Sequence, residues 1–178
     1  MCPRNINEER KKMDEILRRR SIRRFTTQDV GQDLIKKVLA AGMAAPSAGN
    51  EQPWQFIVIK NKETLKKVGE CSPYARSVND APAGIIVCGD LSLEKHPGFW
   101  VQDCSAAVQN MLLEAVSLGL GSVWLGVYPE TDRVSFLRKF FKLPENIVPF
   151  AILPLGFPAQ ELPPVDRYNE SRVHFELW

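Results

Sequence analysis

The chain of 178 residues is 44% hydrophobic and 25% charged, which suits one domain with a full hydrophobic core rather than two domains. Lys and Arg number 23 against 21 for Asp and Glu, and so small an excess argues against a broad nucleic-acid-binding surface. The charged start, Met1 to Glu9, is unlike a secretory signal, and no later stretch resembles a membrane span. We therefore expect a cytoplasmic protein without a membrane or nucleic-acid partner.

Cysteine and histidine are too scattered to suggest a metal site. The residues are Cys2, Cys71, Cys88, Cys104, His96 and His174. No two cysteines have the spacing of zinc ligands or of a redox dithiol, and two histidines are too few for a histidine metal centre. We expect reduced thiols, with Cys88 and Cys104 in the core, and no bound metal.

Apolar periodicity predicts helices and strands in alternation. The first helix runs from Asn7 to Arg19, with Asn7 as its N-cap and Met13, Ile16 and Leu17 on one face. The elements that follow are helix Gln32–Met43, strand Trp54–Ile59, helix Lys62–Glu70, strand Gly84–Gly89, helix Phe99–Leu118, strand Ser122–Val127, helix Glu130–Phe140 and strand Ile147–Leu155.

The predicted strands are short apolar runs without polar alternation, which is typical of strands covered on both faces. Interleaved helices and buried strands favour a sheet sandwiched between helical layers. Helix Phe99–Leu118 has the widest apolar stripe and is predicted to lie centrally. Pro149 and Pro154 are predicted to interrupt the last strand.

The tail from Phe157 to Trp178 is rich in proline and has no helical period. Val173, Phe175 and Leu177 alternate with polar residues, which predicts a terminal strand. An apolar terminal strand requires a sheet edge to pair with, and the edge of a partner subunit is one candidate. The other is an arm that packs on its own domain.

The most informative segment follows the first helix, where Arg19, Arg20 and Arg23 surround Ser21. Guanidinium groups bind phosphate oxygens in pairs and keep their charge when partly buried, and a hydroxyl adds a further hydrogen bond. The segment therefore suits an organic phosphate. A solvated basic face, or an arm that binds nucleic acid or acidic lipid, is the alternative.

A second segment, Pro46 to Trp54, lies between the second helix and the first strand. Its small residues let a ligand approach the backbone, while Ser47, Asn50 and Gln52 supply hydroxyl and amide groups. Such a wall suits a flat heteroaromatic ring. An ordinary turn after a helix is the alternative.

Two further features are single residues with a functional and a structural interpretation. Gly126 ends a strand among bulky residues, where it would either admit a ring or mark a bend. Arg167 stands beside Asp166 in the tail, as either a phosphate ligand or a surface charge with a neighbouring partner.

These four segments, in this order and spacing, resemble the FMN-dependent nitroreductase family from roughly Met13 to Val173. The sequences Arg-Arg-Ser-Ile-Arg and Pro-Ser-Ala-Gly-Asn-x-Gln-Pro-Trp carry the resemblance. It implies an α+β fold with three α/β/α layers around a central mixed sheet, formed by one domain over residues 1–178. It also implies an intertwined homodimer with two interfacial FMN sites, in which residues 157–178 form an exchanged dimerisation arm.

The resemblance further implies which residues bind FMN. The basic segment matches the family's motif for the phosphate, ribityl chain and pyrimidine edge, the tail arginine also reaches the phosphate, the loop comes from the other subunit, and the strand end lies beside the isoalloxazine ring. The cofactor-binding residues are then Arg19, Arg20, Ser21, Arg23, Pro46, Ser47, Ala48, Gly49, Asn50, Gln52, Trp124, Leu125, Gly126 and Arg167.

The implied activity is ping-pong oxidoreduction, in which NAD(P)H reduces FMN and an acceptor such as a nitroaromatic, a quinone or a flavin is then reduced. No side chain is expected to act as a nucleophile or general base. Larger relatives have inserted helices and an acidic residue where this chain has only Asp90 to Phe99 and Gly126, so we expect an open ring face. A flavin-binding protein without significant turnover is the alternative, and reductive dehalogenation or flavin cleavage is a further one.

Overall fold

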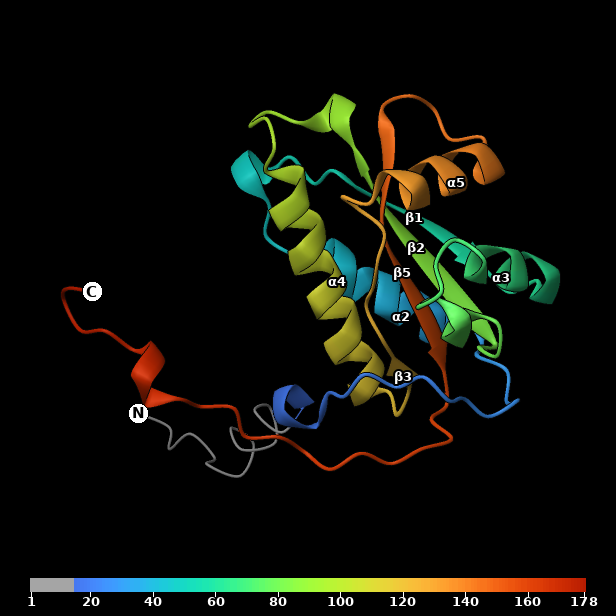
Figure 1. Cartoon of the computed structure of the whole chain (residues 1–178), viewed down its shortest axis with the longest axis horizontal. Coiled ribbons are helices and arrows are strands. Elements are labelled where there is room, and N and C mark those ends of the chain that lie inside the picture. Colours follow the sequence, from blue (N-terminus) through green and yellow to red (C-terminus); the bar gives the residue numbers. More distant parts are fainter. Residues whose placement is uncertain (1–14) are drawn as a thin grey trace.

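The computed structural model of the protein describes residues 15–178. In this range a five-stranded sheet lies between two layers of helices (Figure 1). Its strands are β1 (Trp54–Ile59), β2 (Ala83–Asp90), β3 (Gly121–Ser122), β4 (Leu125–Gly126) and β5 (Ile147–Gly156). Their order is β1-β2-β5-β3, with β4 also on β5, and every one of these pairs is antiparallel. The prediction of a mixed sheet is therefore wrong for the described strands, and the parallel pairing of Ser21 with Ser122 is an isolated bridge outside them.

Helices α2 (Gln32–Met43) and α4 (Trp100–Ser117) cover one face of the sheet, and α3 (Lys62–Gly69) and α5 (Thr131–Phe141) cover the other (Figure 1). This is the predicted three-layer α+β arrangement. The predicted bounds of α2 and β1 are confirmed, and the other three helices end within one residue of theirs. Of the first predicted helix, residues 15–18 are helical, and residues 7–14 lie outside the described range.

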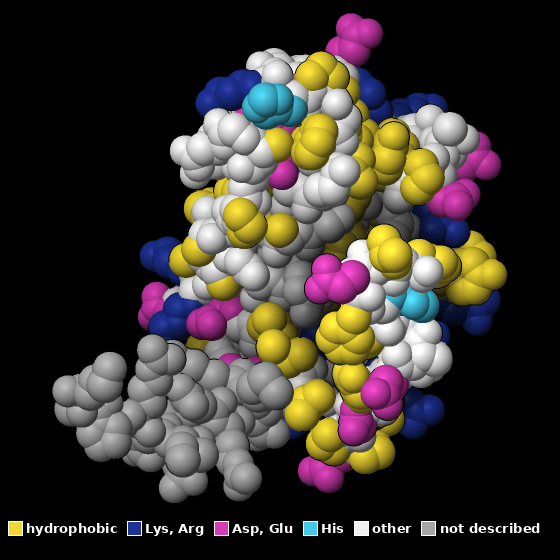
Figure 2. All heavy atoms as spheres, turned by 90° about the vertical axis from the view of Figure 1, so that its left-hand side faces the viewer, with side chains coloured by type: hydrophobic (Ala, Val, Ile, Leu, Met, Phe, Trp, Pro, Cys, Tyr) yellow, Lys and Arg dark blue, Asp and Glu magenta, His cyan; other side chains and the backbone are white. Residues whose placement is uncertain are grey.

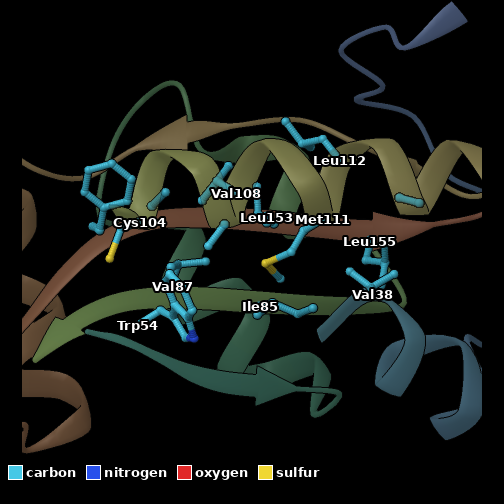
Figure 3. Close-up of a cluster of buried hydrophobic side chains, with 14 of the residues drawn as sticks. Val38, Trp54, Ile85, Val87, Cys104, Val108, Met111, Leu112, Leu153 and Leu155 are labelled. Carbon is cyan, nitrogen blue, oxygen red and sulfur yellow. The ribbon is translucent and has the colours of Figure 1, made fainter. Parts of the chain in front are cut away.

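The larger core fills the layer between the sheet, α2 and α4. Figure 3 shows Val108 and Met111 of α4 directed toward the sheet, near Leu153 of β5 and Ile85 of β2, with Val38 of α2 near Leu155 of β5. Full burial of an aliphatic side chain of this kind stabilises the fold by about 1.5–3 kcal/mol. Gly42 allows α2 to approach α4 closely, because a Cβ there would lie 2.8 Å from Met111 Cγ.

The second core lies on the opposite face, beneath α3 and α5. Side chains alternate along a strand, so β2 directs Ile85 and Val87 toward α4 and Ile86 and Cys88 toward α3 and α5. Both faces of β2 are therefore buried, which explains its apolar sequence. Cys88 and Cys104 are fully buried as predicted, and the described cysteines carry free thiols.

Strand β1 departs from the prediction that all strands are covered on both faces. It lies at the edge of the sheet, and its Gln55 and Val58 are exposed. An apolar run of six residues does not reveal whether a second neighbour will pair with it, so the edge position is set by the sheet order.

Strand β5 runs without a break through Pro149 and Pro154, so the predicted interruption is wrong. A register shift between Val87 and Cys88 places the irregularity of the ladder opposite Pro149. Phe150, the residue skipped by this shift, still contributes its carbonyl, which accepts hydrogen bonds from the N–H groups of Val127 and Tyr128 at 3.0 and 3.1 Å. A bulge accommodates the missing N–H of a proline within a buried strand.

The predicted strand Ser122–Val127 is replaced by two short strands. Ser122 pairs with Leu155 and Leu125 pairs with Ile152, so β3 and β4 keep one register along β5. The break between them spans Val123 and Trp124, whose side chains pack in opposite cores.

The predicted terminal strand at residues 173–177 is wrong for the chain as described. A short 3-10 turn, Glu170–Arg172, precedes it, and the following residues pair with no strand of the described chain. Phe175 and Leu177 are 83% and 84% exposed. A strand requires a hydrogen-bonding edge alongside it, and the tail instead extends away from the sheet (Figure 1).

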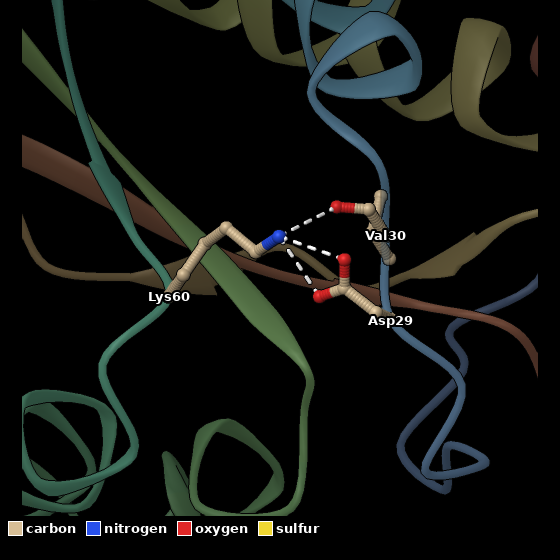
Figure 4. A network of polar contacts seen from close by, with 3 residues as sticks. All are labelled: Asp29, Val30 and Lys60. Carbon is tan, nitrogen blue, oxygen red and sulfur yellow. Dashed lines mark hydrogen bonds and ion pairs between the residues drawn. The ribbon is translucent and has the colours of Figure 1, made fainter.

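An ion pair ties the segment before α2 to the end of β1 (Figure 4). Lys60 Nζ lies 2.8 Å from Asp29 Oδ1, and donates to Asp29 Oδ2 at 2.9 Å and to the Val30 carbonyl at 3.1 Å. An exposed ion pair contributes only about 0–1 kcal/mol. The pair instead holds the segment before α2 in place, because Lys60 also bonds to Val30, whose side chain is fully buried just before that helix.

Within residues 15–178, no helix has the length and apolar character that crossing a bilayer requires.

We predict that Asp90→Asn lowers the free energy of unfolding at neutral pH by about 1 kcal/mol. Asp90 Oδ1 accepts hydrogen bonds from Ser92 N, Ser92 Oγ and Asn146 Nδ2 at 3.0, 2.6 and 2.7 Å. Burial raises the pKa of Asp90, but these donors outweigh it and hold the pKa below 3.8. The stabilisation is therefore present above pH 3.8 and is lost as the pH falls through the pKa of the folded state. Urea unfolding at neutral and acid pH measures it, and a deficit that grows in acid would contradict the prediction.

Candidate functional site

The arginine segment lies against the sheet and against the start of the C-terminal arm. Ile22 N donates to the Ser122 carbonyl at 2.9 Å on one side. Thr26 N donates to Phe157 O, and Ala159 N donates to Arg24 O, both at 2.9 Å. Ile22 is buried, so it anchors the stretch that carries the arginines on either side of it.

Arg19, Arg20 and Arg167 come together although they belong to opposite ends of the chain. Burial lowers the pKa of Arg19, and the positive charges of Arg167 and Arg20 lower it further. Arg20 Nη1 also donates a hydrogen bond to the Pro163 carbonyl of the arm. The structure thus gathers three of the predicted phosphate ligands into one basic cluster, where an anion would relieve the mutual repulsion.

A pocket of about 610 Å³ adjoins this cluster. It lies between Val116 at the C-terminal end of α4, Leu120 just after that helix, and the arm residues 160–164, with Arg18 and Arg20 in its lining. Arms from both ends of the chain therefore form its walls.

A second pocket, of about 310 Å³, brings Arg23 together with Trp124, Leu125 and Gly126. A Cβ at Gly126 would meet no atom within 4 Å, so this wall of the pocket is open as predicted. The strand end and the basic segment, a hundred residues apart in sequence, therefore share one cavity.

The sequence analysis missed six other residues that line the second pocket: the apolar Ala75 and Ile152, and four with polar or titratable side chains. Arg133 Nη1 donates to the Gly126 carbonyl at 2.8 Å, and its guanidinium lies 6.0 Å from the centre of the Tyr74 ring. Burial raises the pKa of the Cys71 thiol, and the charge of Arg133 opposes this shift. Ser72 completes the set. The sequence contains only a weak indication that these residues line a pocket. Arg133 is a basic residue seven positions after Gly126, and no pattern in the sequence distinguishes Tyr74 from a surface residue.

The predicted ring-lining loop has an unusual backbone. Gly49, Asn50 and Gln52 have φ values of 53°, 55° and 48°, in the left-handed region that only glycine adopts freely. Gln52 N donates to Ser47 Oγ at 3.0 Å, and Gln52 Nε2 donates to Asn50 Oδ1 at 3.1 Å. A Cβ at Gly49 would lie 2.7 Å from His96 Nε2, so a larger residue there would have to displace the exposed His96 side chain as well as adopt a positive φ.

The loop lies away from the basic cluster within one chain. Ala48 N donates to Asp103 Oδ1 near the start of α4, at 3.0 Å, whereas Val116 lines the basic pocket near the end of that helix. Thirteen residues of helix separate Asp103 from Val116, or about 20 Å. Residues 46–52 and the arginines therefore form separate parts of the candidate site.

Comparisons with known proteins agree with this architecture. The family model described as Nitroreductase family matches residues 16–87 and 70–157. A provisionally named NADH dehydrogenase/NAD(P)H nitroreductase of Methanothermobacter thermautotrophicus is 52% identical over 93% of this chain and 87% of that protein.

Two solved structures extend the similarity to the fold. A provisionally named NADH oxidase of Clostridium acetobutylicum has a TM-score of 0.91 at 43% identity, over 93% of this chain and 100% of that one. A provisionally named nitroreductase of Desulfovibrio desulfuricans, solved in complex with FMN, has a TM-score of 0.82 at 31% identity, over 94% of this chain and 97% of that one. The similarity therefore spans nearly the full length of each protein.

We predict that Gly121→Ala displaces the arginine segment and lowers the free energy of unfolding by about 1–3 kcal/mol. A Cβ at Gly121 would lie 2.6 Å from Ile22 Cγ2 and 2.8 Å from Ile22 Cβ. Gly126→Ala is the matched control, because its Cβ would meet no neighbouring atom, and we expect a change within about 0.5 kcal/mol. Thermal or urea unfolding compares the two variants, and equal losses would contradict the proposed close approach.

Proposed function

The chain belongs to the nitroreductase family, and we propose that it is an FMN-dependent oxidoreductase that transfers electrons from NAD(P)H to a small acceptor. Nitroaromatics, quinones and free flavins are the proposed acceptors. The observation that carries this proposal is the convergence of Arg19, Arg20 and Arg167 from the two ends of the chain. The FMN complex of the D. desulfuricans structure supports the identity of the cofactor.

The basic cluster fits the phosphate of FMN. A phosphate carries nearly two negative charges at neutral pH and offers several acceptor oxygens, while each guanidinium presents paired N–H donors. Arg19 is partly buried among like charges, an arrangement that a bound dianion stabilises. Arg20 and Arg167 would complete the phosphate site, with Ser21 toward the ribityl chain.

The second pocket fits the ring end of the cofactor. Arg23 and Arg133 place positive charge in it, and Gly126 leaves one wall without a side chain. FMN bound here would supply the redox chemistry, a hydride transfer from the nicotinamide followed by electron transfer to the second substrate. Arg23 and Arg133 would favour negative charge on the ring, and the open wall at Gly126 would let the two substrates reach it in turn, as a ping-pong exchange requires. We assign no side chain the role of nucleophile or base.

A second copy of the chain would complete the site. In one chain the loop 46–52 lies at the far end of α4 from the basic pocket, and we propose that the partner supplies this loop. Hydrophobic side chains are spread over the face that carries α4 and the arm (Figure 2). Exposed apolar residues of the arm are Leu162, Val173, Phe175, Leu177 and Trp178. Pairing in a homodimer with exchanged arms would remove this surface from water.

We predict that the purified protein is yellow and that NADH or NADPH bleaches it in the absence of oxygen. Visible absorbance during anaerobic titration measures both, because the flavin chromophore loses its long-wavelength absorption on reduction. A protein that stays colourless after incubation with FMN would overturn the cofactor assignment. A yellow protein that neither nicotinamide bleaches would instead be a flavin-binding protein without turnover.

We predict that Arg20→Ala and Arg23→Ala each weaken FMN binding by about 1–3 kcal/mol, because each removes a charge-assisted hydrogen bond. Arg24→Ala is the matched control, since it is exposed and only its backbone carbonyl bonds to the arm in the described structure. Quenching of flavin fluorescence gives the three dissociation constants. Equal weakening by Arg24→Ala would show a general charge effect instead of a defined site.

A further inference from the structure

Two carboxyl groups, Glu51 and Asp103, are buried beneath the loop 46–52, with 6% and 4% of their surfaces exposed. We propose that Glu51 and Asp103 are positioning residues that share one proton, and that this proton holds the loop in the shape with which it lines the cofactor. The effect on the cofactor rests on the proposed function. The shared proton itself does not, and it can be tested on the protein without FMN.

The two carboxyl groups join three segments of the chain. Glu51 Oε2 accepts hydrogen bonds from Lys95 N at 2.7 Å and His96 N at 3.1 Å. Asp103 Oδ1 accepts one from Ala48 N at 3.0 Å. The pair therefore links the loop, the connection between β2 and α4, and α4 itself.

The remaining oxygens of the pair require a proton. The two carboxyl groups lie within hydrogen-bonding reach of each other, and Glu51 Oε1 and Asp103 Oδ2 have no other donor in the described structure. Two ionised carboxylates are both acceptors and repel each other, whereas one protonated carboxyl group can donate to the other. Within the described residues no third Asp, Glu, His or Cys completes a metal-binding group, so a proton is the fitting partner.

The surrounding groups place the proton on Asp103. Burial raises the pKa of Glu51, but the N–H groups of Lys95 and His96, the hydrogen bond from Asp103 and the charge of His96 outweigh it, so the pKa is lowered. Burial raises the pKa of Asp103, the Ala48 N–H opposes this, and Glu51 and the charge of Glu94 raise the pKa further. Two other titratable groups lie near the pair. Cys104 follows Asp103 on α4, and the ammonium group of Lys95 donates a hydrogen bond to the Gly49 carbonyl.

The loop depends on the hydrogen bonds of the acid pair because its backbone is strained. Asn50 and Gln52 occupy the left-handed region without being glycine, a conformation that costs of order 1–3 kcal/mol and persists only when neighbouring contacts impose it. Ala48 and Glu51 are the loop's attachment points to the pair. Loss of the shared proton would place two negative charges in contact and push these attachment points apart.

Linkage gives the expected sign of the pH dependence. The pKa of Asp103 is raised above 3.8 in the folded state, so its contribution to stability is complete below pH 3.8 and is lost as the pH rises through the folded pKa. The pKa of Glu51 is lowered below 4.5, so its contribution is present above pH 4.5 and is lost in acid. The intact pair is therefore most stable between the two titrations.

The test compares Asp103→Asn with the natural chain, both without FMN. An asparagine amide donates permanently to Glu51 and still accepts from Ala48 N, so the variant removes only the titration. Melting temperatures from about pH 4 to about pH 9 should show the natural chain losing stability relative to Asp103→Asn as the pH rises. Asp90→Asn is the matched control: because the pKa of Asp90 is lowered, the natural chain should gain stability relative to that variant over the lower part of this range.

Infrared spectroscopy gives a second readout that a merely structural role would not move. Over the pH interval in which the pair is most stable, the natural chain should show the carbonyl stretch of a protonated carboxylic acid, and Asp103→Asn should lack it. Glu51→Gln provides the same comparison from the other partner if Asp103→Asn does not fold. A natural chain without this band, or a band unchanged in both variants, would overturn the shared proton.

FMN titration tests the consequence for the site. The dissociation constant of the natural chain should rise with pH across the interval in which its stability falls, while that of Asp103→Asn stays level. Asp103→Ala, which leaves Ala48 N and Glu51 without their partner, should weaken FMN binding by about 5- to 150-fold. A shared proton with pH-independent FMN affinity would overturn the positioning role alone, and absence of FMN binding at any pH would overturn the proposed function while the infrared result still stands.

Discussion

Main-chain hydrogen bonds on both sides of the arginine segment are the constraint on which the candidate site depends. Ile22 bonds to β3 on one side, and Arg24 and Thr26 bond to the arm on the other. A basic segment with three clustered positive charges repels itself, and side-chain interactions alone would let it fray into solvent. The main-chain hydrogen bonds fix it instead and hold Arg19 near Arg167.

The sheet transmits this constraint through β5. Both short strands that border the site, β3 and β4, hydrogen-bond to β5 in one register, and β5 is buried along nearly its whole length. This buried strand therefore sets the relative positions of Ser122, which accepts a hydrogen bond from Ile22 N in the arginine segment, and Gly126, which opens the second pocket. The residues that border both pockets are thus held in place by the same strand, β5.

Helix α4 has the opposite effect, because it separates the loop 46–52 from the basic cluster by most of its length. The loop carries strained backbone, a buried acid pair and close contact with His96, which is more structure than an ordinary turn requires. A strained, tightly held loop that lies far from the basic pocket of its own chain fits the proposed site shared between two copies.

Local patterns predicted the helices well because a helix is stabilised by residues three and four positions apart, all visible in one window of sequence. The same patterns failed where distant segments decide. The exposure of β1 depends on the absence of a second neighbour, the continuity of β5 depends on a bulge at its own Phe150, opposite Val87 and Cys88 of β2, and the predicted strand near Phe175 depends on an edge that the described chain does not provide.

The residue types in the chain already indicate the chemistry of the site: arginines and a serine suited to phosphate, a loop of small and amide residues, and a glycine at a strand end. Which of these residues meet depends on the three-dimensional fold. Arg167 joins Arg19, Arg133 joins Gly126, and Glu51 meets Asp103 across 52 positions of sequence. The physical reason is that charge, proton sharing and cavity shape act through space, whereas a sequence pattern records only neighbours along the chain.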